Sequence, residues 1–216
     1  MQHNDKKIKF YTGLPNCDTF VCLFEETCTH AKRHKTKLKH KDELLMILIK
    51  LRRNLAMEDL AYRFDFSVSQ VAKIFHRWLH ALYIAVGGLV KWPESDEMKL
   101  PEVFQNDKLR KVRCIMDSTE IFIERPSVLK ARAQTYSNCK RHNTVKVLVA
   151  IRPTGAVVFL STCQGRRVSD QEITLKSGLL EKLLPGDTVL VDHGFMVVKE
   201  FSFRGAKLMV PAFTKK

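Results

Sequence analysis

Residues Arg113–Glu124 have the sequence RCIMDSTEIFIE, and the fold class that we expect for this chain of 216 residues follows from them. Their isoleucine and phenylalanine side chains favour β-structure, so they predict a strand with Asp117 in its middle. A carboxylate inside a buried strand is costly unless it is paired with a cation or binds a metal. Asp117 is therefore a candidate metal ligand. The alternative is a salt bridge to a cation such as Arg113 or Lys146.

The segments after this strand continue the β pattern and end on a second aspartate. Residues 144–162 predict two strands joined by a Pro-Thr-Gly turn, which is a strong hairpin signal. A capped helix is expected to begin at Ser169, and Thr188–Val191 predicts a buried strand that ends in Asp192. This order matches the first part of an RNase H-like fold, a mixed β-sheet in which adjacent central strands would bring Asp117 and Asp192 together.

Two aspartates held side by side can bind divalent ions for phosphodiester cleavage. In a two-metal site one ion activates water or a 3′-hydroxyl, and the other stabilises the leaving oxygen. Carboxylate oxygens suit Mg²⁺ or Mn²⁺. We therefore expect Asp117 and Asp192 to be the metal ligands and the catalytic residues.

The first half of the chain has the pattern of a helix-turn-helix. Asp42–Arg53 and Met57–Phe64 are amphipathic, and Ser67 with Gln70 forms a capping box that opens a third helix. A short helix, a turn and a capped helix with a polar outer face are typical of DNA-binding proteins. The alternative is a plain three-helix bundle with a polar surface. The residues expected to contact DNA from the third helix are Ser69, Gln70, Lys73 and Arg77.

The charge of the chain favours a polyanionic partner. Lys and Arg total 37 against 23 Asp and Glu, which gives a net charge of +14. The acid-free run His30–Lys41 precedes the predicted helices, and we interpret it as a phosphate-contacting arm; a solvated loop and a nuclear-import signal are the alternatives. No apolar run reaches the roughly 18 residues of a membrane span, and no signal peptide is present, so we expect an intracellular, nuclear protein without membrane contact. The basic residues expected to meet DNA phosphates are Lys32, Arg33, Lys35, Lys37 and Lys39.

A zinc site is a weaker interpretation of the first forty residues. Cys22, Cys28, His30 and His34 lie close in sequence, but their spacing lacks a Cys-x2-Cys pair. Cys22 lies in an apolar stretch and is expected to be a small core residue.

The order of these motifs resembles the DDE superfamily endonucleases, specifically the transposase-derived nucleases of PIF/Harbinger type, which carry their own helix-turn-helix. The matching pieces extend over most of the chain. They are FYTGLP at 10–15, the helix-turn-helix at 57–82, DSTEIFIERP at 117–126, YSN at 136–138, HNTVK at 142–146, GRRVSD at 165–170 and LVDHGF at 190–195.

The resemblance implies an α+β (or α/β) chain with four parts: an N-terminal segment and basic arm at 1–41, a helix-turn-helix unit at 42–90, a linker at 91–112, and an RNase H-like endonuclease domain at 113–216. It also implies that Asp117 and Asp192 are the first two metal-binding carboxylates. Asp170 is a weaker third candidate, for which helix capping is the preferred explanation.

The family's third carboxylate, a Glu on a later helix, is expected beyond Lys216, so the domain is expected to be incomplete and its catalysis impaired. Glu200 is too close to Asp192 in sequence to take that place, and no C-terminal helix is expected after Val210–Phe213. A second copy of the chain or a partner protein could supply the missing element. The alternative function is a catalytically inactive, domesticated DNA-binding protein.

Overall fold

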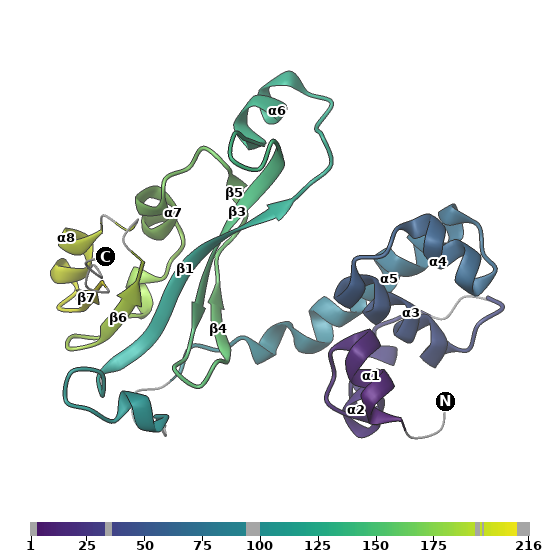
Figure 1. Cartoon of the computed structure of the whole chain (residues 1–216), viewed down its shortest axis with the longest axis horizontal. Helices are drawn as coiled ribbons and strands as arrows, with labels where there is room; N and C mark the ends of the chain where they lie inside the picture. Colours follow the sequence, from purple (N-terminus) through teal and green to yellow (C-terminus); the bar gives the residue numbers. More distant parts are fainter. Residues whose placement is uncertain (1–3, 33–35, 94–99, 193–194, 196, 211–216) are drawn as a thin grey trace, which may run out of the picture. The chain divides into compact units, whose positions relative to one another are not determined.

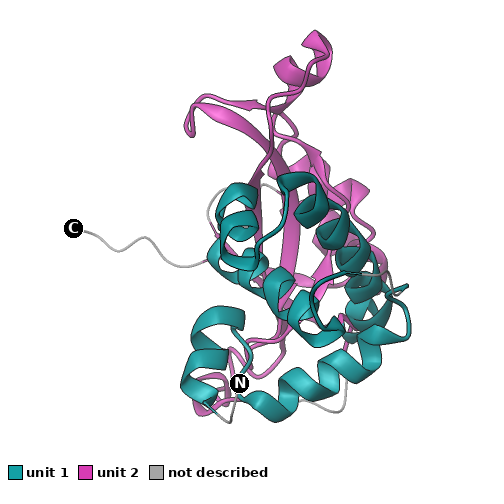
Figure 2. Ribbon diagram, turned by 90° about the vertical axis from the view of Figure 1, so that its right-hand side faces the viewer, with its two compact units in different colours: residues 1–89 teal, residues 90–216 magenta. Residues whose placement is uncertain are grey.

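The computed structural model describes residues 4–32, 36–93, 100–192, 195 and 197–210. The chain forms two compact units, residues 1–89 and residues 90–216 (Figure 2). The first is helical and the second is built on a mixed sheet, so the expected α+β class is confirmed. Over the described residues, no helix is both long and apolar enough to cross a membrane.

Unit 1 packs its helices around one apolar core. Leu44, Leu60, Val71 and Trp78 are buried in it. The expected helices are present, and two further helices lie in the N-terminal segment, for which the sequence analysis predicts no helix. The helices are α1 (Asp5–Thr12), α2 (Cys17–Cys28), α3 (His40–Arg53), α4 (Met57–Phe64) and α5 (Val68–Val86).

Side-chain caps explain why the two unexpected helices begin where they do. The Asn4 side chain accepts a hydrogen bond from the Lys7 amide, and Asn16 accepts one from the Thr19 amide, so each asparagine satisfies an amide that the helix leaves unpaired. Gly13 ends α1 at a φ of 81°, a backbone region that favours glycine.

The turn between α4 and α5 has the chemistry that its sequence predicts. Asp65 ends α4 in the left-handed conformation, and the Ser67 hydroxyl accepts a hydrogen bond from the Gln70 amide. The Gln70 side chain accepts one from the Ser67 amide in return at 3.0 Å, which confirms the predicted capping box.

Unit 2 is a mixed sheet whose strand order is β2-β3-β1-β6-β7, with β4 and β5 also paired to β3 (Figure 1). β1 runs antiparallel to β3 and parallel to β6, and β6 runs parallel to β7. The strands are β1 (Val112–Phe122), β2 (Tyr136–Ser137), β3 (His142–Ile151), β4 (Val157–Leu160), β5 (Gln164–Gly165), β6 (Thr188–Val191) and β7 (Lys207–Met209).

One face of this sheet forms the core of unit 2. Met116, Leu148 and Val191 point into it and pack with Ile173 of α7 (Asp170–Lys176) and Phe201 of α8 (Val198–Phe203). The helix α8 and the strand β7 (Lys207–Met209) follow Asp192, although the sequence pattern predicts neither. Pairing β7 with β6 extends the sheet by one strand.

β1 and β3 continue past the rest of the sheet and carry α6 (Leu129–Thr135) at their far end (Figure 1). We call residues 119–145 of unit 2 the arm; this name does not refer to the basic residues 30–41 of unit 1. The parallel pairing of β1 with β6 stops at Met116, whereas its antiparallel pairing with β3 continues to Phe122. The segment between β1 and β3 holds α6 and the short strand β2.

Candidate functional site

Asp117 and Asp192 occupy equivalent places on neighbouring parallel strands. Met116 of β1 and Val191 of β6 are the last register pair between these strands, and each aspartate is the residue that follows. Paired residues on adjacent strands lie roughly 5 Å apart, and successive side chains point to opposite faces. Because Met116 and Val191 point into the core, the next residue on each strand is directed to the other face. Both aspartates are exposed.

The exposure of Asp117 corrects the expectation of a carboxylate buried within its strand. Both cations considered as its salt-bridge partners pair with other acids. Arg113 Nη2 lies 2.9 Å from Asp187, and Lys146 Nζ lies 3.1 Å from Asp170. Asp117 Oδ1 accepts a hydrogen bond of 2.7 Å from the Ser118 amide.

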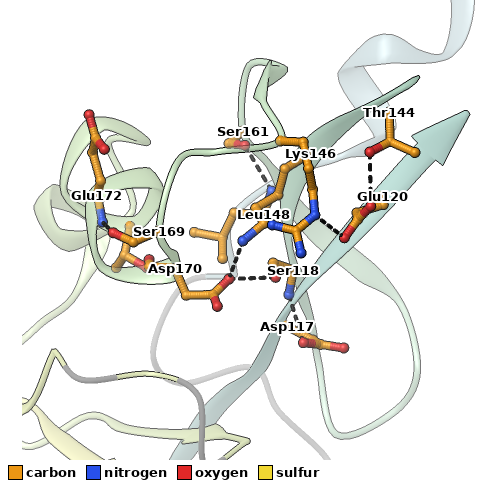
Figure 3. Close-up of polar contacts among 12 residues, drawn as sticks. Asp117, Ser118, Glu120, Thr144, Lys146, Leu148, Ser161, Ser169, Asp170 and Glu172 are labelled. Carbon is orange, nitrogen blue, oxygen red and sulfur yellow. Dashed lines mark hydrogen bonds and ion pairs between the residues drawn. The ribbon is translucent and has the colours of Figure 1, made fainter. Parts of the chain in front are cut away.

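A network on the opposite face of β1 ties this strand to α7 (Figure 3). The Ser118 hydroxyl donates a hydrogen bond of 2.6 Å to Asp170 Oδ1, and the same oxygen accepts one from Lys146 Nζ. The Lys146 side chain is 8% exposed, so its charge is compensated inside the unit. This network fixes the β1 backbone at the residue next to Asp117.

The network also changes the explanation of Asp170. The cap of α7 is Ser169, whose hydroxyl accepts a hydrogen bond of 3.0 Å from the Glu172 amide. The Glu172 carboxylate pairs with Lys176. Capping therefore does not account for Asp170, because its carboxylate links the first turn of α7 to β1 and β3.

Glu120 is a polar residue on β1 whose role the sequence pattern does not reveal. Its carboxylate accepts a hydrogen bond of 2.8 Å from Thr144 and lies 2.6 Å from Arg166 Nε. Burial alone would raise the pKa of Glu120, but hydrogen bonds from Thr144 and Ser137 and the nearby cations hold it below its ordinary value. Glu120 is thus an ionised structural link between β1, β3 and the segment after β5.

Glu200 lies on α8 and accepts a hydrogen bond of 2.9 Å from Gln171 of α7. That hydrogen bond lowers the pKa of Glu200. The hydrogen bond between Gln171 and Glu200 thus connects α7 with α8, the two helices that cover the core face of the sheet.

The donor set at the two aspartates fits a divalent cation that prefers oxygen ligands. Within the described ranges, no group of three or more His, Cys, Asp or Glu residues is arranged to hold a metal. Cys22 is exposed on α2, which corrects its assignment as a core residue. The fit therefore rests on Asp117 and Asp192 as a pair.

Unit 1 contains a basic groove between α5 and the segment before α3, with a volume of about 1040 Å³. Lys32, Lys37 and Lys73 line it, and Phe66 and Ile74 form part of its apolar floor. The remaining residues that line the groove are His30, Thr36, Gln70, Arg77, His80 and Ile84.

The residues expected to contact DNA take different positions in unit 1. Ser69, Gln70 and Lys73 are exposed on the first turns of α5, and Lys32 and Lys39 are exposed before α3. Lys37 is also exposed, and its ammonium group lies 2.9 Å from Asp65. Arg33 and Lys35 lie outside the described residues.

Arg77 differs from the other predicted DNA contacts because it is largely buried. Its side chain is 14% exposed and donates to the Glu43 carboxylate, which is 1% exposed. Glu43 also accepts hydrogen bonds from Trp78 Nε1 at 2.9 Å and from Thr36 Oγ1 at 2.6 Å. Arg77 therefore joins α5 to α3 inside unit 1.

The same contacts keep Glu43 ionised. Burial by itself raises the pKa of the Glu43 carboxyl, but hydrogen bonds from Thr36, Trp78 and Arg77 together with the Arg77 charge outweigh it and lower the pKa below its ordinary value. The helical position of Glu43 gives no sequence signal for this role, because its three partners are brought together by tertiary packing.

Two protein-family models match parts of the chain. Residues 116–216 match the family described as DDE superfamily endonuclease. Residues 36–87 match the helix-turn-helix of DDE superfamily endonuclease. Comparisons with curated proteins and with solved structures gave no match.

Proposed function

We propose that this chain is a DDE superfamily endonuclease with a helix-turn-helix, as the two family matches support. The chain is a transposase-derived, nuclease-like DNA-binding protein of PIF/Harbinger type. Unit 1 binds DNA, and Asp117 and Asp192 of unit 2 hold divalent cations, Mg²⁺ or Mn²⁺, for phosphodiester cleavage. The proposal places the protein in the nucleus, where its DNA substrate lies.

The observation that carries the nuclease proposal is the parallel register of β1 and β6. The register ends at Met116 and Val191, so Asp117 and Asp192 follow at the same level of the sheet. A hairpin strand on one side of β1 and a parallel strand on the other support an RNase H-like arrangement for this unit.

Each group in the site has a separate task in the proposed reaction. Divalent cations at this site would supply the chemistry of an activated nucleophile and of charge stabilisation at the leaving oxygen. Asp117 and Asp192 hold the cations, and the Ser118–Asp170 hydrogen bond keeps β1 from shifting beside Asp117. The exposure of both aspartates leaves their face of the sheet open to a substrate as large as DNA.

The DNA-binding proposal rests on the exposed first turns of α5. Ser69 and Lys73 point outward there, and a helix of this kind can place polar side chains against base edges in the major groove. Gln70 has its side-chain oxygen in the capping box, which leaves its amide nitrogen as the atom for a base contact. Lys32 and Lys37 contribute charge toward phosphates.

A second candidate function is DNA binding without cleavage. Unit 1 favours this function because it has its own core and its own basic groove, and neither Asp117 nor Asp192 belongs to that core or groove.

A plasmid-nicking assay of the full chain with Mg²⁺ or Mn²⁺ tests the two functions. Asp117→Asn is compared with Asp107→Asn, a matched control whose side chain is 93% exposed. Metal-dependent nicking that disappears in Asp117→Asn and persists in Asp107→Asn supports the nuclease. DNA binding with no nicking by the unaltered chain overturns the nuclease and leaves the binding function.

A further inference from the structure

We infer that the arm of unit 2, residues 119–145, is a second DNA-contact surface that holds the duplex beside the reacting phosphodiester. The inference rests on the proposed nuclease function, because it concerns DNA that already lies at Asp117. It adds a surface that is separate from the helix-turn-helix and belongs to the unit that carries the two aspartates.

The arm carries a strong excess of positive charge. Five basic and two acidic residues lie within it. Of the two acids, Glu120 is neutralised by Arg166, which leaves Glu124 as the exposed acid of this segment. The four exposed cations of the arm are Arg125, Lys130, Lys140 and Arg141.

Hydrogen bonds hold the helix and the loop of the arm against β3. The buried Asn143 side chain donates hydrogen bonds to the Arg132 carbonyl at 3.1 Å and to Thr135 Oγ1 at 2.8 Å, which fastens α6 to β3. Arg132 Nε donates to the Pro126 carbonyl and closes the loop before α6. A Cβ at Gly165 would lie 3.1 Å from the Gln134 carbonyl oxygen, so β5 packs closely against the end of α6.

The position of the arm matches the spacing of phosphates along DNA. Phe122, the last residue of β1, is five residues beyond Asp117. A strand rises about 3.3 Å per residue, so Phe122 lies roughly 16 Å from Asp117 along the strand. Base pairs repeat every 3.4 Å or so, which makes this distance about five base pairs. A duplex that runs along β1 from a phosphate at Asp117 would therefore have further phosphates alongside the arm, which carries Lys130 and Arg141.

The start of α6, which we call the tip of the arm, also exposes apolar side chains. Val128 is 63% exposed and Leu129 is 74% exposed, at the start of α6. A protein partner could also use them, but the surrounding charge favours DNA, in which apolar side chains can contact the minor groove between phosphate contacts.

The experiment measures binding of the full chain to a 30-base-pair duplex by fluorescence anisotropy, over a series of salt concentrations without divalent metal. The arm variant carries Arg125→Gln, Lys130→Gln, Lys140→Gln and Arg141→Gln. The matched control removes four exposed charges elsewhere in unit 2 and carries Lys108→Gln, Lys111→Gln, Lys182→Gln and Lys207→Gln. Thermal unfolding establishes that both variants fold.

The arm variant should bind more weakly than the control, and its dependence of log K on log salt should be shallower by about 3 to 4, since each lost phosphate contact removes roughly 0.9. The single variant Lys130→Glu should weaken binding in the same direction. Equal affinities and equal salt slopes in the arm variant and the control overturn the inference and favour a protein partner for the tip.

Failure of the arm is distinguishable from failure of the nuclease. Unaltered nicking activity that depends on Asp117, combined with an arm variant that behaves as the control, overturns the arm alone. A chain that never nicks DNA but loses salt-sensitive binding in the arm variant supports the arm and overturns the nuclease.

Discussion

Asp117 and Asp192 lie one residue beyond the last parallel register pair of β1 and β6, on strands that are neighbours in the sheet although the residues are far apart in sequence. The core face of both strands is covered by α7 and α8, and both aspartates are exposed. The same packing that buries Met116 and Val191 thus presents two carboxylates to solvent.

The Glu43–Arg77 pair should be a main determinant of the stability of unit 1. Glu43→Gln leaves the largely buried Arg77 without its counter-ion, and breaking a buried pair in this way costs about 3 to 5 kcal/mol. Urea denaturation followed by circular dichroism measures the loss. The control Asp59→Asn, which breaks the more exposed pair with Arg63, should cost less than about 1 kcal/mol.

The lowered pKa of Glu43 predicts a specific acid sensitivity. Because the folded-state pKa lies below the ordinary value of 4.5, the ionised carboxylate stabilises the fold fully above that value and loses its effect as pH falls through the lowered folded pKa. Unfolding free energies measured from pH 7 to pH 3 should fall more steeply for the unaltered chain than for Glu43→Gln. Parallel curves would show that Glu43 does not titrate with folding.

Lys73 and Arg77 lie one helical turn apart on α5, and we predict opposite phenotypes for them. Lys73→Ala should weaken DNA binding. It should change the free energy of unfolding by less than about 0.5 kcal/mol, because the side chain is exposed. Arg77→Ala should lower the thermal midpoint, because it leaves Glu43 buried without its cation. Anisotropy and thermal melting of both variants measure the contrast, and a stable Arg77→Ala with weakened DNA binding would assign Arg77 to the DNA interface.

The thiols should differ sharply in reactivity. Burial, followed by the charge of Asp187, raises the pKa of Cys114 to about 12, although Arg113 opposes the shift. Cys22, Cys139 and Cys163 are exposed. A thiol reagent at pH 8 should modify these three within minutes and should modify Cys114 after denaturation, as read by peptide mass spectrometry. Rapid modification of Cys114 in the folded chain would contradict its place in the sheet core.

Local patterns in the sequence predict several elements well. Met57–Phe64 and Thr188–Val191 have the predicted bounds, and the Ser67–Gln70 capping box is present, because amphipathic spacing and capping depend on neighbouring residues. The helices α1, α2 and α6 are less evident. Polar residues dominate α1 and α6, and all three helices depend on tertiary packing, to which α1 and α2 add side-chain caps.

The properties of the candidate site depend on contacts that sequence spacing does not reveal. The exposure of Asp117 follows from which face of β1 is covered by α7 and α8, and the role of Asp170 follows from its contacts with Ser118 and Lys146. The burial of Arg77 follows from Glu43 on another helix. In each case a long-range partner determines what the side chain does.

The most direct test of the account is Mn²⁺ binding to the full chain, measured by isothermal titration calorimetry for the unaltered protein, Asp117→Asn, Asp192→Asn and the control Asp107→Asn. A site formed jointly by the two aspartates predicts that either single substitution removes the Mn²⁺ isotherm, whereas Asp107→Asn retains it. An unchanged isotherm in Asp117→Asn and Asp192→Asn would contradict the assignment of these residues as metal ligands.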